Sequence, residues 1–279
     1  MMRLAIVATP AALPDFRPAP GALDGDALRS RLLLSDAGYH VVDLDPAIDL
    51  AEQLELLFEQ TPLDPGTPAL FYASARVASS AEGELFLCLD TESPETGDSL
   101  RDIATVIRDR IPGPVAFVIE CRHPVDEEDP FRSATIVGAA KDSLRGVGAS
   151  GAGVEVLVAA RPMSEDAEER TSPLTRALIE ALDEVDPDVG LSLVDFFERV
   201  RDSDVLVGVV PCFAHMKARD RFFLIEGAGA AEPAGSAAIP EVTSEAEMPA
   251  VDDAPSPEVA PISEVAVIID DAPSSDVAP

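Results

Sequence analysis

The fold of this chain is decided by the stretch Val115-Ala116-Phe117-Val118-Ile119-Glu120-Cys121-Arg122-His123-Pro124. Its first five residues are apolar and three of them are β-branched, which predicts a buried strand. The strand is expected to end before Pro124, because proline cannot donate a hydrogen bond to a neighbouring strand. Cys121, Arg122 and His123 then lie at the carboxyl end of the strand. In an open α/β sheet, ligands and catalytic groups collect at that edge.

Short apolar segments alternate with amphipathic segments on both sides of this stretch. Strands are predicted at residues 4–9, 39–44, 69–73, 84–89, 154–160 and 221–226, and helices from about residue 26 and at 50–58, 99–107, 134–144, 172–185 and 192–200. The 84–89 strand is expected to form a β-hairpin with the 69–73 strand. Ser99 and Ser172 are typical N-cap residues, and Pro173 suits a first helical position. The alternation predicts a three-layer α/β/α sandwich with a mainly parallel sheet.

The composition changes after residue 226. Residues 227–279 contain eleven acidic and no basic side chains and are rich in Ala, Pro and Ser. Such a segment buries too little apolar surface to offset its ordering entropy, so we predict a folded domain over 1–226 and a disordered acidic tail over 227–279. An Asp-Asp-Ala-Pro-Ser motif occurs at 252–256 and again at 270–274. This repeat is consistent with a bivalent docking peptide or with low-complexity drift.

The charge balance and the cysteines exclude several kinds of partner. The formal net charge of −32 would repel both nucleic-acid phosphates and anionic membranes. The three cysteines, Cys88, Cys121 and Cys212, are widely spaced, so neither a disulfide framework nor a metal site is expected. The N-terminal apolar run is too short for a membrane span. We therefore expect a cytoplasmic protein that uses no metal or cofactor.

The strand that ends in Glu120-Cys121-Arg122-His123 is one of several segments that suggest a family. The others are residues 4–8, 35–41, 70–77, 89–90, 175–178 and 220–224. In this order and spacing they resemble the caspase and metacaspase-like cysteine peptidases. In that family the nucleophile strand ends in Asp-x-Cys-His-Ser-Gly, and an earlier strand ends in Phe-Tyr-x-Ser-Gly-His-Gly. The resemblance covers residues 1 to about 226 and implies a caspase-like fold.

The resemblance also implies that both catalytic positions are replaced. Arg122 stands at the position of the family's cysteine, and Arg76 stands at the position of its histidine. A cysteine peptidase needs a thiolate, a base that generates it and backbone amides that hold the oxyanion. A guanidinium with a pKa above about 12 is neither a nucleophile nor a base at neutral pH. These replacements predict a pseudoenzyme.

Cys121 offers an alternative in which the chain is an active cysteine endopeptidase. Moving the alignment by one residue makes Cys121 the nucleophile, with His123 on the same face of the strand. Side chains at i and i+2 of a strand are roughly 7 Å apart, which is too far for the hydrogen bond that activates a thiol. A buried apolar role for Cys121 is the competing interpretation, and it extends to Cys88 and Cys212.

Arg76 and Arg122 have two competing interpretations as well. Each is expected on a polar loop, where an arginine is usually only solvated. In the family the two positions face each other across the cleft, which implies that the two guanidiniums converge. They would then form an anion-binding cleft for an acidic peptide, such as the Asp-Asp repeats of the tail.

The prediction from the sequence is a catalytically dead caspase-like protein. It would act as a regulator, binding partner or substrate of an active caspase-like protease or paralogue. By analogy with the family, we expect a dimer formed through a sheet edge. The first alternative is the cysteine endopeptidase that uses Cys121. A further alternative is a small-molecule binding module on a flavodoxin-like sheet.

Overall fold

The computed structural model describes residues 2–10, 22–35, 37–64, 66–80, 82–89, 97–125, 131–145, 154–163, 172–201, 209–216 and 221–228. The predicted acidic tail lies outside the described residues from position 229 onward. Its first two residues, Gly227 and Ala228, follow the last strand, and the Ala228 amide donates a 2.8 Å hydrogen bond to the Pro187 carbonyl. Within the described part of the chain, no helix is long and apolar enough to cross a bilayer.

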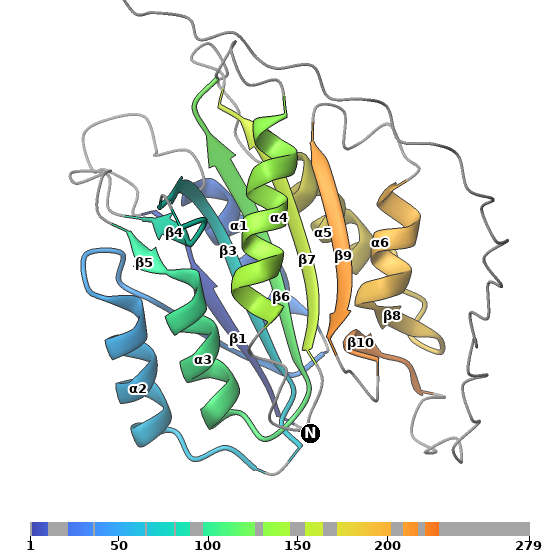
Figure 1. The fold of residues 1–279 in the computed structure, drawn as a ribbon. Coiled ribbons are helices and arrows are strands. Elements are labelled where there is room, and N and C mark those ends of the chain that lie inside the picture. Colours follow the sequence, from blue (N-terminus) through green and yellow to red (C-terminus); the bar gives the residue numbers. More distant parts are fainter. Residues whose placement is uncertain are drawn as a thin grey trace, which may run out of the picture. The chain divides into compact units, whose positions relative to one another are not determined.

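A mainly parallel sheet forms the centre of the fold (Figure 1). Its strands, in spatial order, are β2 (Tyr39–Asp43), β1 (Arg3–Ala8), β3 (Ala69–Ser79), β6 (Val115–His123), β7 (Val154–Pro162) and β9 (Val210–Met216). The first five are parallel, and β9 runs antiparallel to β7. The strands β4 (Leu85–Cys88) and β5 (Asp98–Ser99) extend the sheet from the far end of β3. All nine residues of β6 are buried, as the apolar run predicts.

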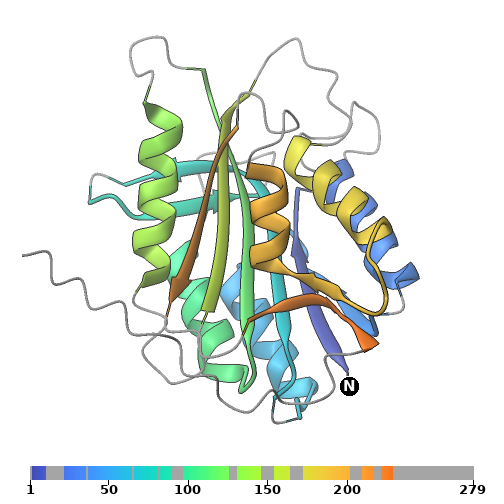
Figure 2. The same ribbon diagram turned by 90° about the vertical axis from the view of Figure 1, so that its right-hand side faces the viewer.

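Helices cover both faces of this sheet (Figures 1 and 2). One face carries α2 (Leu50–Gln60), α3 (Leu100–Arg110) and α4 (Arg132–Arg145), and the other carries α1 (Ala22–Leu34), α5 (Pro173–Asp183) and α6 (Leu193–Arg201). Side chains alternate along each strand between the two apolar cores. In β1, Leu4 and Ile6 enter the core under α2, whereas Ala5 and Val7 enter the core under α1. The predicted three-layer α/β/α class is confirmed.

The predicted helix starts are confirmed at α3 and α5. The Ser99 hydroxyl accepts a 3.2 Å hydrogen bond from the Asp102 amide. The Ser172 hydroxyl accepts a 3.0 Å hydrogen bond from the Thr175 amide, and Pro173 is the first residue of α5. Each cap satisfies an amide that has no acceptor within its own helix.

The structure corrects the predicted end of the third strand. β3 continues to Ser79 instead of ending at Ala73, because its far half pairs with β6 on one side and with β4 on the other. Arg76 therefore lies within a strand and not on a loop. The hairpin with β4 is present, but its turn is confined to residues 80–84.

Three other features of the fold differ from the predictions. The final strand, β10 (Phe223–Glu226), pairs with β8 (Gly190–Ser192) in a separate two-stranded sheet. β9, which contains Pro211, has no counterpart among the predicted strands; it lies at the edge of the sheet, where proline is tolerated. α1 begins about four residues earlier than expected and includes Gly25. A β-carbon on Gly25 would lie 2.3 Å from the Thr9 hydroxyl, so the close approach of α1 to the end of β1 requires glycine.

Candidate functional site at the carboxyl edge of the sheet

Buried polar side chains gather where β3, β6 and β7 end, beneath α1 and α5. We call this group the carboxyl-edge cluster, and it consists of Asp24, Ser74, Glu120, Arg122, Arg161 and Ser172. Each of these residues is less than 9% exposed. Charges removed from water to this extent require partners. The cluster supplies two carboxylates and two guanidiniums, so its formal charges balance.

Asp24 is the centre of the hydrogen bonding in this cluster. Its Oδ2 atom is ion-paired with Arg122 Nη2 and accepts a 2.9 Å hydrogen bond from the Ser74 hydroxyl. Its Oδ1 atom accepts a 2.6 Å hydrogen bond from the Ser172 amide. The side chain of Asp24 is 1% exposed, and that of Arg122 is 4% exposed. One carboxylate therefore ties α1 to β3, to β6 and to the start of α5.

Glu120 completes the cluster on its other side. Its Oε1 atom accepts a 2.8 Å hydrogen bond from Arg161 Nε and lies 4.0 Å from Arg122 Nε. Burial raises the pKa of the Glu120 carboxyl above its ordinary value, and the positive charges of Arg122 and Arg161 oppose that rise. The two arginines therefore favour the charged form of the Glu120 carboxyl, whereas burial favours the neutral form and has the larger effect on the pKa.

The two arginines that the sequence analysis singled out, Arg76 and Arg122, are direct neighbours. Arg76 of β3 and Arg122 of β6 are register partners on adjacent parallel strands, so their side chains project from the same face of the sheet. Their environments differ, because Arg76 is exposed whereas Arg122 is buried. The expectation that Arg122 is a solvated loop residue is wrong. Its guanidinium is paired with Asp24 and is not presented to an external anion, so the expected cleft of two open guanidiniums is not formed.

Cys121 lies on the opposite face of β6, toward α4. Its side chain is fully buried within the apolar core on that face. Burial raises the pKa of the Cys121 thiol, and the nearby Glu120 charge raises it further. Both changes oppose the thiolate that a cysteine nucleophile requires. The other cysteines are also free thiols; Cys88 is buried and Cys212 is half-buried.

His123 is held by two partners, and neither of them is Cys121. Its Nδ1 atom lies 2.9 Å from the Pro124 carbonyl oxygen, and its Nε2 atom lies 2.7 Å from the Ser133 hydroxyl. Ser133 belongs to the first turn of α4. The geometry therefore brings His123 together with a serine that the sequence analysis did not single out. The ten-residue separation of the two residues leaves no local pattern that predicts the contact.

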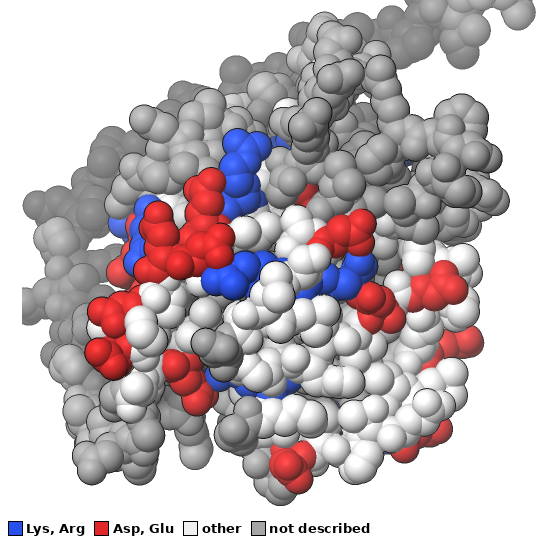
Figure 3. All heavy atoms as spheres, turned by 180° about the vertical axis from the view of Figure 1, so that it is seen from behind, with Lys and Arg blue, Asp and Glu red and all other residues white. Residues whose placement is uncertain are grey.

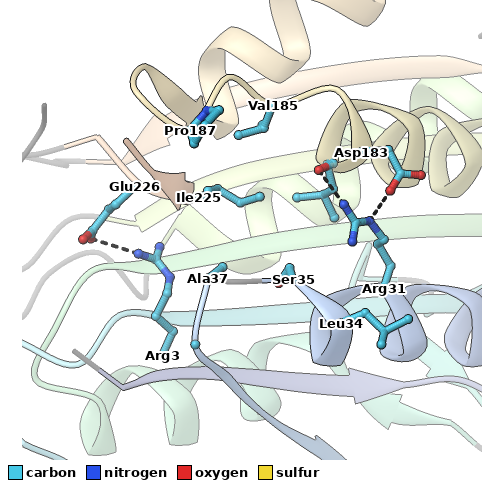
Figure 4. A pocket seen from close by; sticks show the side chains of 12 residues that line it. Arg3, Arg31, Leu34, Ser35, Ala37, Asp183, Val185, Pro187, Ile225 and Glu226 are labelled. Atoms are coloured by element: carbon cyan, nitrogen blue, oxygen red, sulfur yellow. Dashed lines mark hydrogen bonds and ion pairs between the residues drawn. The ribbon is translucent and has the colours of Figure 1, made fainter. Parts of the chain in front are cut away.

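A pocket of about 580 Å³ lies at the opposite edge of the sheet, between the end of α1, the end of α5 and β10 (Figure 4). Arg3 and Arg31 lie at its two ends. Arg3 is ion-paired with Glu226 at 2.9 Å, and Arg31 is ion-paired with Asp183. Since Arg3 begins β1, this pocket is remote from the carboxyl-edge cluster.

Basic and acidic side chains are interspersed on the face covered by α1, α5 and α6 (Figure 3). Arg29 contacts Asp26 and Asp43, and Arg199 lies 3.9 Å from Glu184. Neighbouring carboxylates thus offset the positive charges on this face. The described residues also contain no group of three or more potential metal ligands.

No family model and no curated protein matches the chain. Among solved structures, the chain is similar to the protein GSU0716 from Geobacter sulfurreducens, with a TM-score of 0.52 and 11% sequence identity. The match covers 82% of this chain and 98% of that chain. At this identity the likeness concerns the fold alone.

Proposed function

We propose that this chain is a relative of the caspase-like cysteine peptidases that has lost peptidase activity. In this proposal it acts as a regulator, binding partner or substrate of an active caspase-like protease. The supporting observation is the register of β3 and β6, in which Arg76 and Arg122 are direct partners. These are the two positions at which the family resemblance requires a histidine and a cysteine.

The contacts of Arg122 support the loss of peptidase chemistry. A nucleophile at this position must reach a substrate, but Arg122 is buried and its charge is matched by Asp24. Arg76 supplies no base, since a guanidinium stays protonated at neutral pH. Cys121, the thiol next to Arg122 in the sequence, is buried on the other face of the strand. In this proposal, the family's cysteine is replaced by Arg122, which forms a structural ion pair with Asp24. The family's histidine is replaced by Arg76, which is exposed.

The edge of the sheet supports a binding role. β9 pairs with β7 on one side and ends the main sheet on the other. The outer backbone groups of an edge strand can pair with a strand of another chain. We therefore propose β9 as the edge through which this chain joins a protease partner or a second copy of itself.

Peptide hydrolysis tests this proposal. The full chain is incubated with fluorogenic peptides ending in Arg, Lys or Asp, alone and together with an active caspase-like peptidase. The proposal predicts no hydrolysis by the chain alone and, in the mixture, either an altered peptidase rate or cleavage of the chain. Turnover by the chain alone that is abolished by Cys121→Ala would establish the endopeptidase alternative. An unchanged rate together with an intact chain would contradict the regulatory role.

A further inference from the structure

His123 and Ser133 form a hydrogen-bonded pair at the junction of β6 and α4. The Ser133 hydroxyl lies 2.7 Å from His123 Nε2, within the range for a nucleophile and its general base. The His123 side chain is buried, and Ser133 is half-buried. The pair therefore lies where the apolar core under α4 meets the surface of the domain.

The Pro124 carbonyl fixes the tautomer of the neutral imidazole. A carbonyl oxygen only accepts hydrogen bonds, so the 2.9 Å contact places the ring proton on His123 Nδ1. Nε2 then carries the lone pair, and the Ser133 hydroxyl must donate to it. A base oriented by a third group and aimed at a hydroxyl is the arrangement that activates a serine for nucleophilic attack.

The first turn of α4 provides a place for negative charge next to this hydroxyl. The amides of Ser133 and Ala134 lie in the first turn of the helix, where an amide has no acceptor within its own helix. The helix dipole is positive at the same end. An oxyanion that forms on a carbonyl attacked by Ser133 would therefore be stabilised by backbone donors that need no rearrangement.

We propose that Ser133 is an acyl-accepting nucleophile activated by His123, and that this site hydrolyses uncharged esters with apolar acyl groups. Two exposed apolar side chains flank the pair in sequence: Val125 is 62% exposed and Phe131 is 75% exposed. They offer apolar surface to an acyl chain. The formal charge of −32 repels carboxylated substrates, so an uncharged ester is favoured.

The reaction proceeds in two steps, acylation of Ser133 and hydrolysis of the acylated serine. Ser133 Oγ forms a bond to the ester carbonyl carbon while its proton moves to His123 Nε2. The carbon–oxygen bond to the alcohol then breaks, and His123 returns the proton to the departing alkoxide. Water attacks the acylated serine with His123 as the base, which releases the carboxylic acid and restores the Ser133 hydroxyl.

The neutral partner of His123 limits this chemistry to reactive esters. A carboxylate next to the imidazole would stabilise the imidazolium that forms during attack, whereas the Pro124 carbonyl offers only a dipole. Amide bonds, which have poorer leaving groups, are therefore expected to remain intact. This inference goes beyond the proposed protein-binding role and does not depend on it. Serine-directed and thiol-directed probes report on the two proposals separately.

An uncharged alkyl fluorophosphonate tests the inference on the full wild-type chain. Ser133 Oγ displaces fluoride from phosphorus, and mass spectrometry locates the adduct. We expect Ser133 to be labelled about 100-fold faster than Thr135, an exposed hydroxyl of the same helix that lacks an imidazole partner. Labelling of Ser133 that is no faster than labelling of Thr135 would overturn the inference, whether or not any variant folds.

Ester turnover provides the second measurement. With p-nitrophenyl butyrate, Ser133→Ala and His123→Gln are each expected to lower the rate at least about tenfold, whereas Thr135→Ala leaves it unchanged. Circular dichroism of each variant establishes that it is folded. A folded Ser133→Ala protein that retains wild-type turnover would contradict the assignment.

Discussion

The two faces of β6 place neighbouring residues in contrasting environments. Glu120 and Arg122 project toward α1 and α5, where charged groups neutralise one another in a buried cluster. Cys121 and His123 project toward α4, where a buried thiol adjoins the hydrogen bond between His123 and Ser133. A step of one residue along a strand therefore separates a buried ionic network from a buried thiol and a histidine–serine hydrogen bond.

The difference between the faces shows what fixes a side chain and what leaves it reactive. The guanidinium of Arg122 is paired with the buried carboxylate of Asp24. Moving the guanidinium away would leave the buried charge of Asp24 without its counter-charge. Among the described residues the Ser133 hydroxyl has one hydrogen-bond partner, His123, and Ser133 is half-buried. Charge compensation thus gives the face of β6 toward α1 and α5 a structural role. The hydroxyl that could react lies on the face toward α4.

The largest effect is expected from Asp24→Ala, which removes the charge that compensates Arg122. We expect the free energy of unfolding to fall by about 3–5 kcal/mol, because a buried guanidinium loses its closest partner. Urea denaturation measures the change. Asp26→Ala is the matched control, since Asp26 lies on the same helix with its side chain 61% exposed, and it should cost less than about 1 kcal/mol. Equal effects of the two variants would show that the buried ion pair of Asp24 with Arg122 adds nothing to stability, and would contradict the structural role of this face.

A double-mutant cycle sharpens the same contrast. Asp24→Asn and Arg122→Met are each expected to be destabilising, because each leaves one charge of the pair without its partner. The double variant should be more stable than the sum of the single effects predicts, with a coupling energy on the order of 2 kcal/mol. Additive effects would show that Asp24 and Arg122 do not stabilise each other. Thermal denaturation of the four proteins at one pH gives the coupling.

A smaller, pH-dependent effect is expected at Glu155 of β7. Its Oε1 atom accepts a 3.0 Å hydrogen bond from the Phe222 amide, and burial raises its pKa from 4.5 to about 7. The folded state then binds more protons than the unfolded state between these two values, so stability falls as the pH rises from about 4.5 to about 7. Glu155→Gln should weaken the dependence of stability on pH. It should also raise the melting temperature at pH 8 by roughly a few degrees. A wild-type melting temperature that rises over this pH range would contradict the raised pKa.

The smallest effect on stability is expected on the α4 side of β6. Ser133→Ala removes one hydrogen bond from His123, which should lower the free energy of unfolding by about 1 kcal/mol. This loss is well below that expected for Asp24→Ala, because no buried charge is left without a partner. Guanidinium denaturation compares the two variants. A loss for Ser133→Ala as large as that for Asp24→Ala would remove the distinction between the faces.

Much of the fold follows from local patterns in the sequence. The apolar run of β6, the N-cap serines of α3 and α5 and the alternation of strands with helices all correspond to observed elements. β9 was missed because the tolerance for Pro211 depends on an edge position, which only the assembled sheet defines. The predictions for residues 229–279 lie outside the described part of the chain.

The candidate site was harder to predict than the fold. The positions of Arg122 and Cys121 at the carboxyl end of β6 follow from Pro124 and from the strand period. The burial of Arg122 depends on Asp24, which is 98 positions away in the sequence. Asp24 lies beside Gly25 and was expected to precede helix α1, whereas it lies within α1. The contact between His123 and Ser133 likewise depends on how α4 docks against β6. Long-range partners of this kind leave no spacing signal in the sequence.

Native thiol labelling tests the central claim, that Arg122 of β6 is held in a buried ion pair and that Cys121 is buried and unreactive on the opposite face of the same strand. The wild-type chain is treated with peptide electrophiles ending in Arg, Lys or Asp, and the modified cysteines are mapped by mass spectrometry against a denatured control. The account predicts that half-buried Cys212 reacts first and that Cys121 reacts only after unfolding, whichever peptide is used. Rapid, peptide-dependent labelling of Cys121 in the native chain would contradict the account and would identify an active cysteine site.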